Sequence, residues 1–219
     1  MNIFVINSGS SSLKYQLIEM PSEKVICSGI VERIGQEEGD IIHKTFGGGI
    51  EKVKRVELKI EDHGKGLQEV VSLLTDPENA VIKDPSAIDI VGHRVVHGGE
   101  KYSAPTRVTA EVKQEIRRLA VFAPEHNPAE VNGIETAEQI FKSRPQVAVF
   151  DTAFHQTLPK HALIYPGPYA WYERGIRRYG FHGISHQYVS RRAARLLGRE
   201  ADGLKLITCP PATMTLLLP

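Results

Sequence analysis

The chain has 219 residues, of which 41% are hydrophobic and 24% are charged, and its 27 basic and 26 acidic residues leave a formal net charge of +1. This composition is typical of a globular protein, and the balanced charge provides no basic surface for a nucleic-acid partner. The only cysteines are Cys27 and Cys209, which excludes a disulfide scaffold. No secretory signal and no apolar run of roughly 20 residues occur, so we expect a cytoplasmic protein without a membrane partner.

The N-terminal residues predict a β-hairpin. Residues 3–6 form a short apolar run rich in β-branched and aromatic side chains, and Leu13, Tyr15 and Leu17 alternate with polar residues. The connecting segment, Asn7-Ser8-Gly9-Ser10-Ser11-Ser12, consists of turn-forming residues.

The turn of this hairpin has the chemistry of a phosphate cradle. Gly9 allows backbone N–H groups to approach an anion, the hydroxyls of Ser10 and Ser12 can donate to its oxygens, and Lys14 adds a positive charge. It is not a Walker loop, because the pattern G-x-x-x-x-G-K-[ST] is absent from the chain. A solvated turn without a ligand is the alternative interpretation.

Further strands and a helix follow the hairpin. We expect strands over residues 24–33, 41–46 and 53–60, separated by glycine-rich turns. Apolar residues recur at helical spacing over 67–74, and Asp76-Pro77 ends this pattern. This part of the chain therefore predicts an antiparallel sheet covered by an amphipathic helix.

The middle of the chain alternates strands with capped helices. Residues 88–96 and 146–150 predict two mostly apolar strands. Between them, Thr109 is expected to cap one helix, and Asn127, followed by a proline, is expected to cap a second that runs to Phe141. This order of elements predicts a mixed α/β sheet.

The sequence changes in character after residue 151, where prolines interrupt a segment rich in histidine and tyrosine. We therefore place a domain boundary near this residue. Ser185 is expected to cap a helix through Leu197, which Gly198 ends, and residues 204–209 predict a strand. The apolar side of this helix would comprise Tyr188, Val189, Ala193, Leu196 and Leu197.

Polar side chains stand where binding groups are expected. Arg94 lies at the end of an apolar strand, and its planar guanidinium suits a carboxylate or a phosphate, a structural ion pair being the alternative. Asp151 directly follows another strand and suits a base or a metal partner, or else a turn or N-cap. His182 lies between Gly180 and Gly183, which allow the backbone to pass close to a ligand that His182 would contact. The alternative is a core histidine that is hydrogen-bonded to a carbonyl. No histidine or cysteine pair has zinc-site spacing.

Taken together, these clusters make the chain similar to the acetate kinase (acetokinase) family. The motifs that carry the resemblance are Asn7-Ser8-Gly9-Ser10-Ser11-Ser12-Leu13-Lys14, His93-Arg94-Val95-Val96-His97-Gly98-Gly99, Phe150-Asp151-Thr152-Ala153-Phe154-His155 and Tyr179-Gly180-Phe181-His182-Gly183. They cover residues 1–209, which corresponds to the first half of a family member.

The resemblance implies an α/β fold of the acetate and sugar kinase/Hsp70/actin superfamily. Residues 1–150 would form an N-terminal ribonuclease-H-like (actin-like ATPase) domain with a mixed sheet, and residues 151–219 the incomplete start of a second, similar domain that binds nucleotide. The family members are homodimers that transfer phosphate reversibly between ATP and acetate with Mg²⁺.

The resemblance also implies roles for residues near the N-terminus. Asn7 matches the asparagine of the family's Mg²⁺ site. Lys14 matches a lysine assigned to ATP, and Ser10 and Ser12 would contribute to the same cofactor-binding turn.

The remaining matches concern the substrate and the reaction. Arg94 matches the arginine that binds the substrate carboxylate, and Val96 matches a valine of the acetate methyl pocket. Asp151 matches the active-site aspartate, and His182 matches the histidine that stabilises the transferring phosphoryl group. Such groups suit phosphoryl transfer, which depends on positioning and on positive charge around the phosphoryl oxygens.

One departure from the family pattern lies in the substrate pocket. Glu125 stands where the family has a leucine, in Ala123-Pro124-Glu125-His126-Asn127-Pro128. A carboxylate beside bound acetate costs desolvation and repulsion, so Glu125 turns to solvent, or its pKa rises, or the acyl specificity differs. A kinase for propionate or butyrate is therefore an alternative function.

A second departure follows Cys209, where the chain continues with Pro210-Pro211-Ala212-Thr213 and the family has a second phosphate-binding turn, His-Leu-Gly-Asn-Gly-Ser. We expect a truncated or frame-shifted member that lacks the ATP half and has lost activity. A non-catalytic fragment that binds an anion or a full-length subunit is the other alternative.

Sequencing the encoding DNA beyond the Cys209 codon in all three frames tests this expectation. A frame shift predicts codons for His-Leu-Gly-Asn-Gly in another frame, and their absence from every frame contradicts it.

Overall fold

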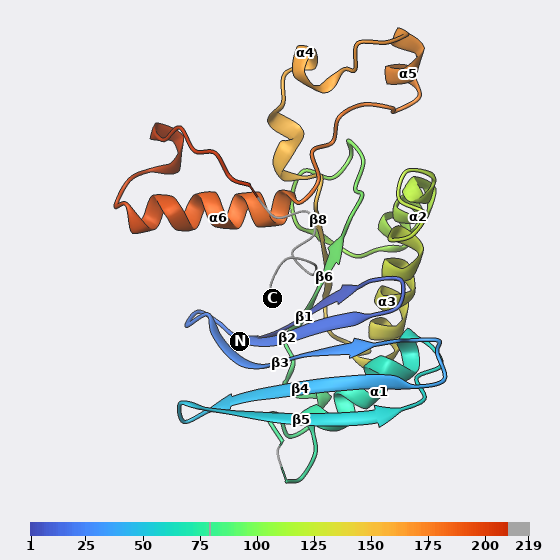
Figure 1. The fold of residues 1–219 in the computed structure, drawn as a ribbon, viewed down its shortest axis with the longest axis vertical. Coiled ribbons are helices and arrows are strands. Elements are labelled where there is room, and N and C mark those ends of the chain that lie inside the picture. Colours follow the sequence, from blue (N-terminus) through green and yellow to red (C-terminus); the bar gives the residue numbers. More distant parts are fainter. Residues whose placement is uncertain (79, 210–219) are drawn as a thin grey trace. The chain divides into compact units, whose positions relative to one another are not determined.

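The computed structural model describes residues 1–78 and 80–209, and its strands form one eight-stranded mixed sheet (Figure 1). The strands are β1 (Asn2–Ser8), β2 (Leu13–Glu19), β3 (Lys24–Glu32), β4 (Gly39–Gly47), β5 (Ile50–Leu58), β6 (Ile90–Val95), β7 (Thr106–Arg107) and β8 (Gln146–Phe150). The α-helices are α1 (His63–Leu74), α2 (Ala110–Arg118), α3 (Asn127–Ile140), α4 (Lys160–Leu163), α5 (Tyr169–Glu173) and α6 (Gly183–Leu196). The 3₁₀ helices are η1 (Pro85–Ala87), η2 (Leu119–Val121), η3 (Phe154–Thr157) and η4 (Ala201–Gly203). The strand order is β5-β4-β3-β2-β1-β6-β8-β7, which confirms the predicted mixed α/β sheet.

The first five strands form an antiparallel meander. β1 pairs with β2, β2 with β3, β3 with β4 and β4 with β5. These pairings confirm the predicted hairpin and the strands after it, although the strand ends differ by a few residues from those expected. On its other side, β1 pairs in parallel with β6, and Ile6 lies opposite His93. β1 is therefore bonded to strands from two distant parts of the chain.

One face of this meander is buried beneath α1 and α3 (Figure 1). Alternate residues of β1 and β2 point to this face and are buried: Phe4, Ile6, Leu13, Tyr15 and Leu17. They pack in one cluster with residues of α1 and α3, among them Leu67, Val70, Leu74 and Ala137. The residues between them, such as Lys14 and Gln16, face the opposite, exposed side. The predicted amphipathic helix is confirmed as α1, and burial of its apolar side holds it on the sheet.

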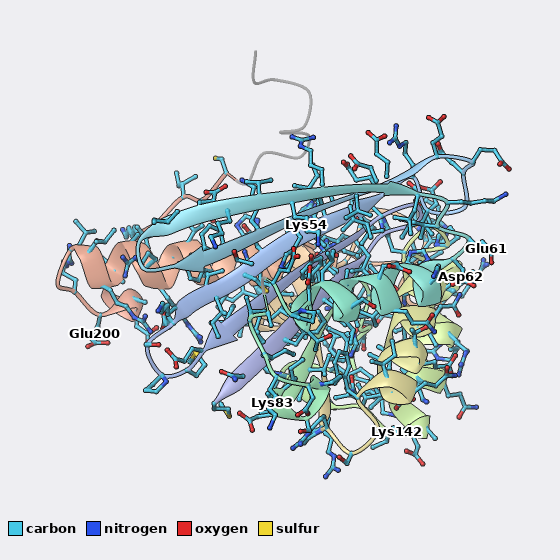
Figure 2. All side chains as sticks on the ribbon, turned by 90° about the horizontal axis from the view of Figure 1, so that it is seen from below. Lys54, Glu61, Asp62, Lys83, Lys142 and Glu200 are labelled. Atoms are coloured by element: carbon cyan, nitrogen blue, oxygen red, sulfur yellow. The ribbon has the colours of Figure 1, made fainter. Side chains whose placement is uncertain are left out.

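Side-chain caps begin two of the helices. Asp62 caps α1 by accepting a hydrogen bond from the backbone N–H of Lys65 at 2.8 Å, and Figure 2 shows Asp62 at the start of this helix. Thr109 caps α2 as predicted, since its hydroxyl accepts from Val112 N–H at 3.3 Å. The predicted Asn127 cap of α3 is wrong, because the side chain of Asn127 is bonded to other segments of the chain.

The chain divides into two compact units. The first unit comprises residues 1–97 and 105–149, and the second comprises residues 98–104 and those from 150 onward. The division falls beside residue 151, where the sequence suggested a boundary, while the assignment of 98–104 to the second unit was not anticipated. The identity of each unit as a ribonuclease-H-like domain stays a prediction.

Helix α6 of the second unit begins at Gly183, so the prediction that Ser185 caps it is wrong. At this start, the N–H of Gly183 donates to the carbonyl of Asp151 at 2.8 Å. Gly198 follows the end of the helix as predicted and has a φ of +62°, a left-handed conformation that favours glycine.

The apolar side predicted for α6 lies at the surface, where Tyr188, Val189, Leu196 and Leu197 are exposed. The strand predicted over residues 204–209 is wrong: within the described part of the chain, no strand pairs with this segment to form a ladder. Residues 210–219, which follow Cys209 where the sequence departs from the family pattern, lie outside the described residues. Among the described helices, none combines the length and the apolarity needed to cross a bilayer.

The buried histidine of β6 links the stability of the first unit to pH. The Nε2 of His93 lies 2.7 Å from Oε1 of Gln146, and since this oxygen only accepts, Nε2 carries the proton of the neutral ring. Burial lowers the pKa of His93 from 6.5 to about 4. The folded chain therefore favours the neutral ring, whereas the unfolded chain takes up a proton below about pH 6.5.

We expect the contribution of His93 to the unfolding free energy to be largest above about pH 6.5 and to fall as the pH drops toward 4. The loss due to His93 is expected to be about 3 kcal/mol. Urea unfolding at about pH 7 and about pH 4.5 measures this loss, and His93→Gln is expected to reduce it by about 2 kcal/mol. The exposed His161→Gln serves as control and should leave it unchanged. An equal loss in His93→Gln and the parent chain would contradict the prediction.

Candidate functional site

Three residues of the predicted site meet at the end of β1. Asn7 of β1 lies opposite Lys14 in the antiparallel register with β2. On the other side, the parallel register with β6 brings Arg94 next to Asn7, and the Nη1 of Arg94 donates to Oδ1 of Asn7 at 3.1 Å. The pairing of β1 with two neighbours therefore gathers an amide, an ammonium and a guanidinium that lie far apart in the sequence.

Asn7 and Lys14 also line a pocket of about 420 Å³ on the exposed face of the sheet, whereas Arg94 is not among its lining residues. Its polar lining residues are Asn7, Lys14, Gln16, Ser28 and Lys44, and its apolar ones include Val5, Ile30 and Ile42. Lysines and neutral donors line this pocket, and its described lining contains no acidic side chain. Such a surface attracts anions and has room for a small apolar group beside them.

The turn between β1 and β2 has a defined conformation. The N–H of Gly9 donates to the carbonyl of Ser12 at 2.8 Å, and the side chain of Ser10 is exposed. The Nε2 of His63, the first residue of α1, lies 2.7 Å from the carbonyl of Gly9 and donates to it. His63 is a contact that the sequence did not signal, because it falls outside every motif.

The chain after β6 is held by buried polar side chains of α3. Val96, which is 8% exposed, donates through its backbone N–H to both carboxylate oxygens of Glu130 at 3.1 Å. The N–H and C=O of His97 are bonded to the amide of Asn127 at 3.2 and 3.1 Å, and this amide also donates to the carbonyl of Ile116 at 2.9 Å. Sequence analysis missed these contacts of Asn127 and Glu130, because the sequence of α3 does not show which strand the helix will pack against.

The side chain of Glu125 is exposed in the structure. It lies between η2 and α3, in the same connection as Phe122, whose ring stacks on the imidazole of His97 at a centroid distance of 5.6 Å. Of the alternatives considered for this carboxylate, the structure therefore shows the solvent-facing one.

The other predicted site residues belong to the second unit. Asp151, which follows β8, is 2% exposed, and its carbonyl accepts from the N–H of Gly183. A Cβ at Gly183 would collide with this carbonyl, so only glycine permits the contact. The neighbouring Thr152 accepts from the N–H of Gly98 at 3.1 Å. These bonds bring the chain at Asp151 beside the start of α6.

His182 stands directly before α6 in a strained conformation. Gly180, Phe181 and His182 have φ values of +88°, +58° and +49°. Non-glycine residues rarely adopt this region, at a cost of about 1–3 kcal/mol each, and such residues cluster at functional sites. The N-terminus of the 14-residue helix α6 adds unpaired N–H groups and the positive end of the helix dipole.

The structure thus brings together Asn7, Lys14 and Arg94 within the first unit, and the chain at Asp151 and His182 within the second. The action of both groups on one substrate stays a prediction. No three histidine, cysteine, aspartate or glutamate side chains of the described residues lie together as a metal cluster.

Comparison with known proteins gives a consistent result. The profile of the acetokinase family matches residues 2–211. The acetate kinase of Thermotoga maritima is 51% identical over 210 residues, which cover 95% of this chain and 51% of the relative. The acetate kinase of Acetivibrio thermocellus is 50% identical over 210 residues, which cover 95% of this chain and 52% of the relative.

Two solved structures show the same similarity. The acetate kinase of Porphyromonas gingivalis matches with a TM-score of 0.84 and 42% identity, covering 92% of this chain and 50% of that protein. A propionate kinase from Francisella tularensis matches with a TM-score of 0.80 and 36% identity, covering 91% of this chain and 50% of that protein.

These matches first define a class: the chain is an α/β protein with the actin-like ATPase fold of the acetate kinases, as the sequence predicted. More narrowly, it belongs to the acetokinase family, which confirms the resemblance carried by the four motifs. The chain spans about half the length of the curated relatives it matches.

The importance of α3 for the segment after β6 is testable by removing the Asn127 amide. Asn127→Ala leaves the N–H and C=O of His97 and the carbonyl of Ile116 without this partner, so we expect a loss of about 3 kcal/mol in unfolding free energy. The exposed Asn132→Ala of the same helix is the control and should change it by less than about 0.5 kcal/mol. Urea unfolding measures both, and equal effects of the two substitutions would contradict the prediction.

Proposed function

We propose that this chain provides the carboxylate-binding part of an acetate kinase, which transfers a phosphoryl group reversibly between ATP and acetate. The observation that carries the proposal is the convergence of Arg94 with Asn7 and Lys14 in a member of the acetokinase family. Asn7 and Lys14 also line a pocket whose described lining holds no acidic residue. The products in the forward direction are acetyl phosphate and ADP.

Each residue of the first unit suits one part of this reaction. The guanidinium of Arg94 presents parallel donors that match the two oxygens of a carboxylate. Val96 lies on the segment that α3 holds and is suited to pack on the methyl group. Lys14, with the hydroxyls of Ser10 and Ser12 in the adjacent turn, provides charge and donors for phosphate oxygens.

The residues of the second unit suit the transferring group. His182, before the N-terminus of α6, provides an imidazole donor for an equatorial phosphoryl oxygen. Asp151 is buried beside the start of the same helix, where its carboxylate would orient the groups around the phosphoryl group. Phosphoryl transfer requires mainly this kind of positioning and charge stabilisation.

Mg²⁺ fits this chain only as an ion that the nucleotide carries. The amide oxygen of Asn7 is a suitable ligand type, but it accepts a hydrogen bond from Arg94, and the described residues form no cluster of metal ligands. We propose that the amide oxygen of Asn7 would contact Mg²⁺ when the ion is bound together with ATP. When bound, Mg²⁺ neutralises phosphate charge.

Further properties are proposed from the family. ATP is the phosphoryl donor, and the functional assembly is a homodimer in the cytoplasm without a nucleic-acid or membrane partner. Because the chain spans about half of its relatives, these properties concern the whole protein of which such a chain would be part.

A propionate or butyrate kinase is the second candidate function. It is favoured by the similarity to the propionate kinase of Francisella tularensis and by Glu125, for which the resemblance to the family implies a leucine of the substrate pocket.

The test is acetyl phosphate formation from ATP, Mg²⁺ and acetate, trapped as the hydroxamate, together with acetate binding followed by ligand-observed NMR. We expect Arg94→Ala to weaken acetate binding about tenfold or more and to slow transfer by about 10² or more, and Asp151→Asn to slow transfer similarly. The exposed Arg55→Ala is the control and should leave both unchanged.

Acetate binding that is insensitive to Arg94→Ala would refute the proposed site, and turnover that is insensitive to Asp151→Asn would refute its assignment. Propionate and butyrate, tested in competition with acetate, separate the two candidate functions, because a preference for either longer acid would favour the second.

A further inference from the structure

The segment before α6 contains three consecutive residues with positive φ, and two of them are not glycine. Phe181 and His182 have φ values of +58° and +49°, in a region that side-chain-bearing residues rarely occupy. Such a segment relaxes to ordinary backbone angles unless its surroundings hold it. The contacts of this segment therefore decide the direction in which His182 projects.

His155 of η3 provides one contact of this segment. Its Nε2 lies 2.9 Å from the carbonyl oxygen of Phe181, and because a carbonyl only accepts, Nε2 carries the proton and donates. The same imidazole lies against Gly180, where a Cβ would collide with the ring. His155 thus binds one residue of the left-handed segment and packs on another.

Two further rings contact the imidazole of His155, which is half-buried. The ring of Phe154 contacts the imidazole edge-on at a centroid distance of 5.3 Å. The ring of His186, which belongs to α6, also contacts it edge-on at a centroid distance of 5.3 Å. Burial and the neighbouring imidazoles of His155 and His182 lower the pKa of His186. These contacts keep the ring of His155 in one orientation relative to α6.

We infer that His155 is a positioning residue that holds the segment Gly180–His182 in its left-handed conformation and thereby aims the His182 side chain at the phosphoryl group. The role of His182 rests on the proposed function, whereas the hold of His155 on the segment is a property of this chain alone. A small misplacement of a group that contacts the reacting atoms lowers the rate by as much as 10²-fold, so losing this hold should reduce turnover even though His155 does not touch substrate.

Two substitutions separate the hydrogen bond from the packing. His155→Phe keeps a ring of similar size but removes the donor, and His155→Gln keeps an N–H donor at about the position of Nε2. The exposed His161→Phe of the same unit is the matched control.

The first measurement is NMR of the full 219-residue chain. We expect the parent to show His155 as the Nε2–H tautomer in long-range ¹H–¹⁵N spectra, and Phe181 and His182 to show Cα and Cβ shifts of positive φ. These shifts should be lost in His155→Phe and kept in His155→Gln and His161→Phe. An Nδ1–H tautomer in the parent, or unchanged shifts in His155→Phe, would overturn the inference, and the parent tautomer decides even if a variant fails to fold.

The second measurement is turnover in the hydroxamate assay. We expect kcat to fall about tenfold or more in His155→Phe, with the KM for acetate changed by less than about twofold, and most of the rate to return in His155→Gln. Turnover that depends on His182 but not on His155 would refute the positioning role. Absence of turnover in the parent is the result expected of a chain that lacks the ATP half, and the NMR result then decides the inference alone.

Discussion

The pairing of β1 with β2 on one side and with β6 on the other is the constraint on which the first unit's site depends. The antiparallel register places Lys14 opposite Asn7, and the parallel register brings Arg94 to the same position from a strand about ninety residues later in the chain. Because side chains alternate across a strand, a shift of either register by a single residue would turn one of these groups to the buried face. The burial of Phe4 and Ile6 beneath α1 and α3 is what prevents such a shift.

Buried polar groups make the surroundings of this site specific as well as stable. Asn127 and Glu130 lie almost fully buried in α3, and both bind backbone groups of the segment after β6. A buried polar group without a hydrogen-bond partner lowers the stability of the fold, whereas a paired one restricts the backbone to which it is bonded. These two side chains therefore favour a single arrangement of that segment. His93 follows the same logic: burial stabilises its neutral form, and Gln146 satisfies its donor.

Elements with strong periodicity and local caps could be predicted from the sequence. The alternation at 13–17 defines β2, and Thr109 caps α2 because an N-cap involves only neighbouring residues. The caps assigned to Asn127 and Ser185 were wrong for one shared reason. In each helix, the first residue is hydrogen-bonded to a distant segment of the chain. The strand expected over 204–209 failed because a strand requires a partner, and apolar character does not provide one.

The sequence by itself determined the family, the identity of the charged and polar residues, and the secondary structure of the meander, because motif chemistry and periodicity are local properties of the chain. Only the tertiary structure decided that Arg94 is bonded to Asn7, that Glu125 is exposed, and that His155 holds the left-handed segment before α6. Each of these depends on backbone positions far apart in the chain, and these become neighbours only through sheet register and helix packing.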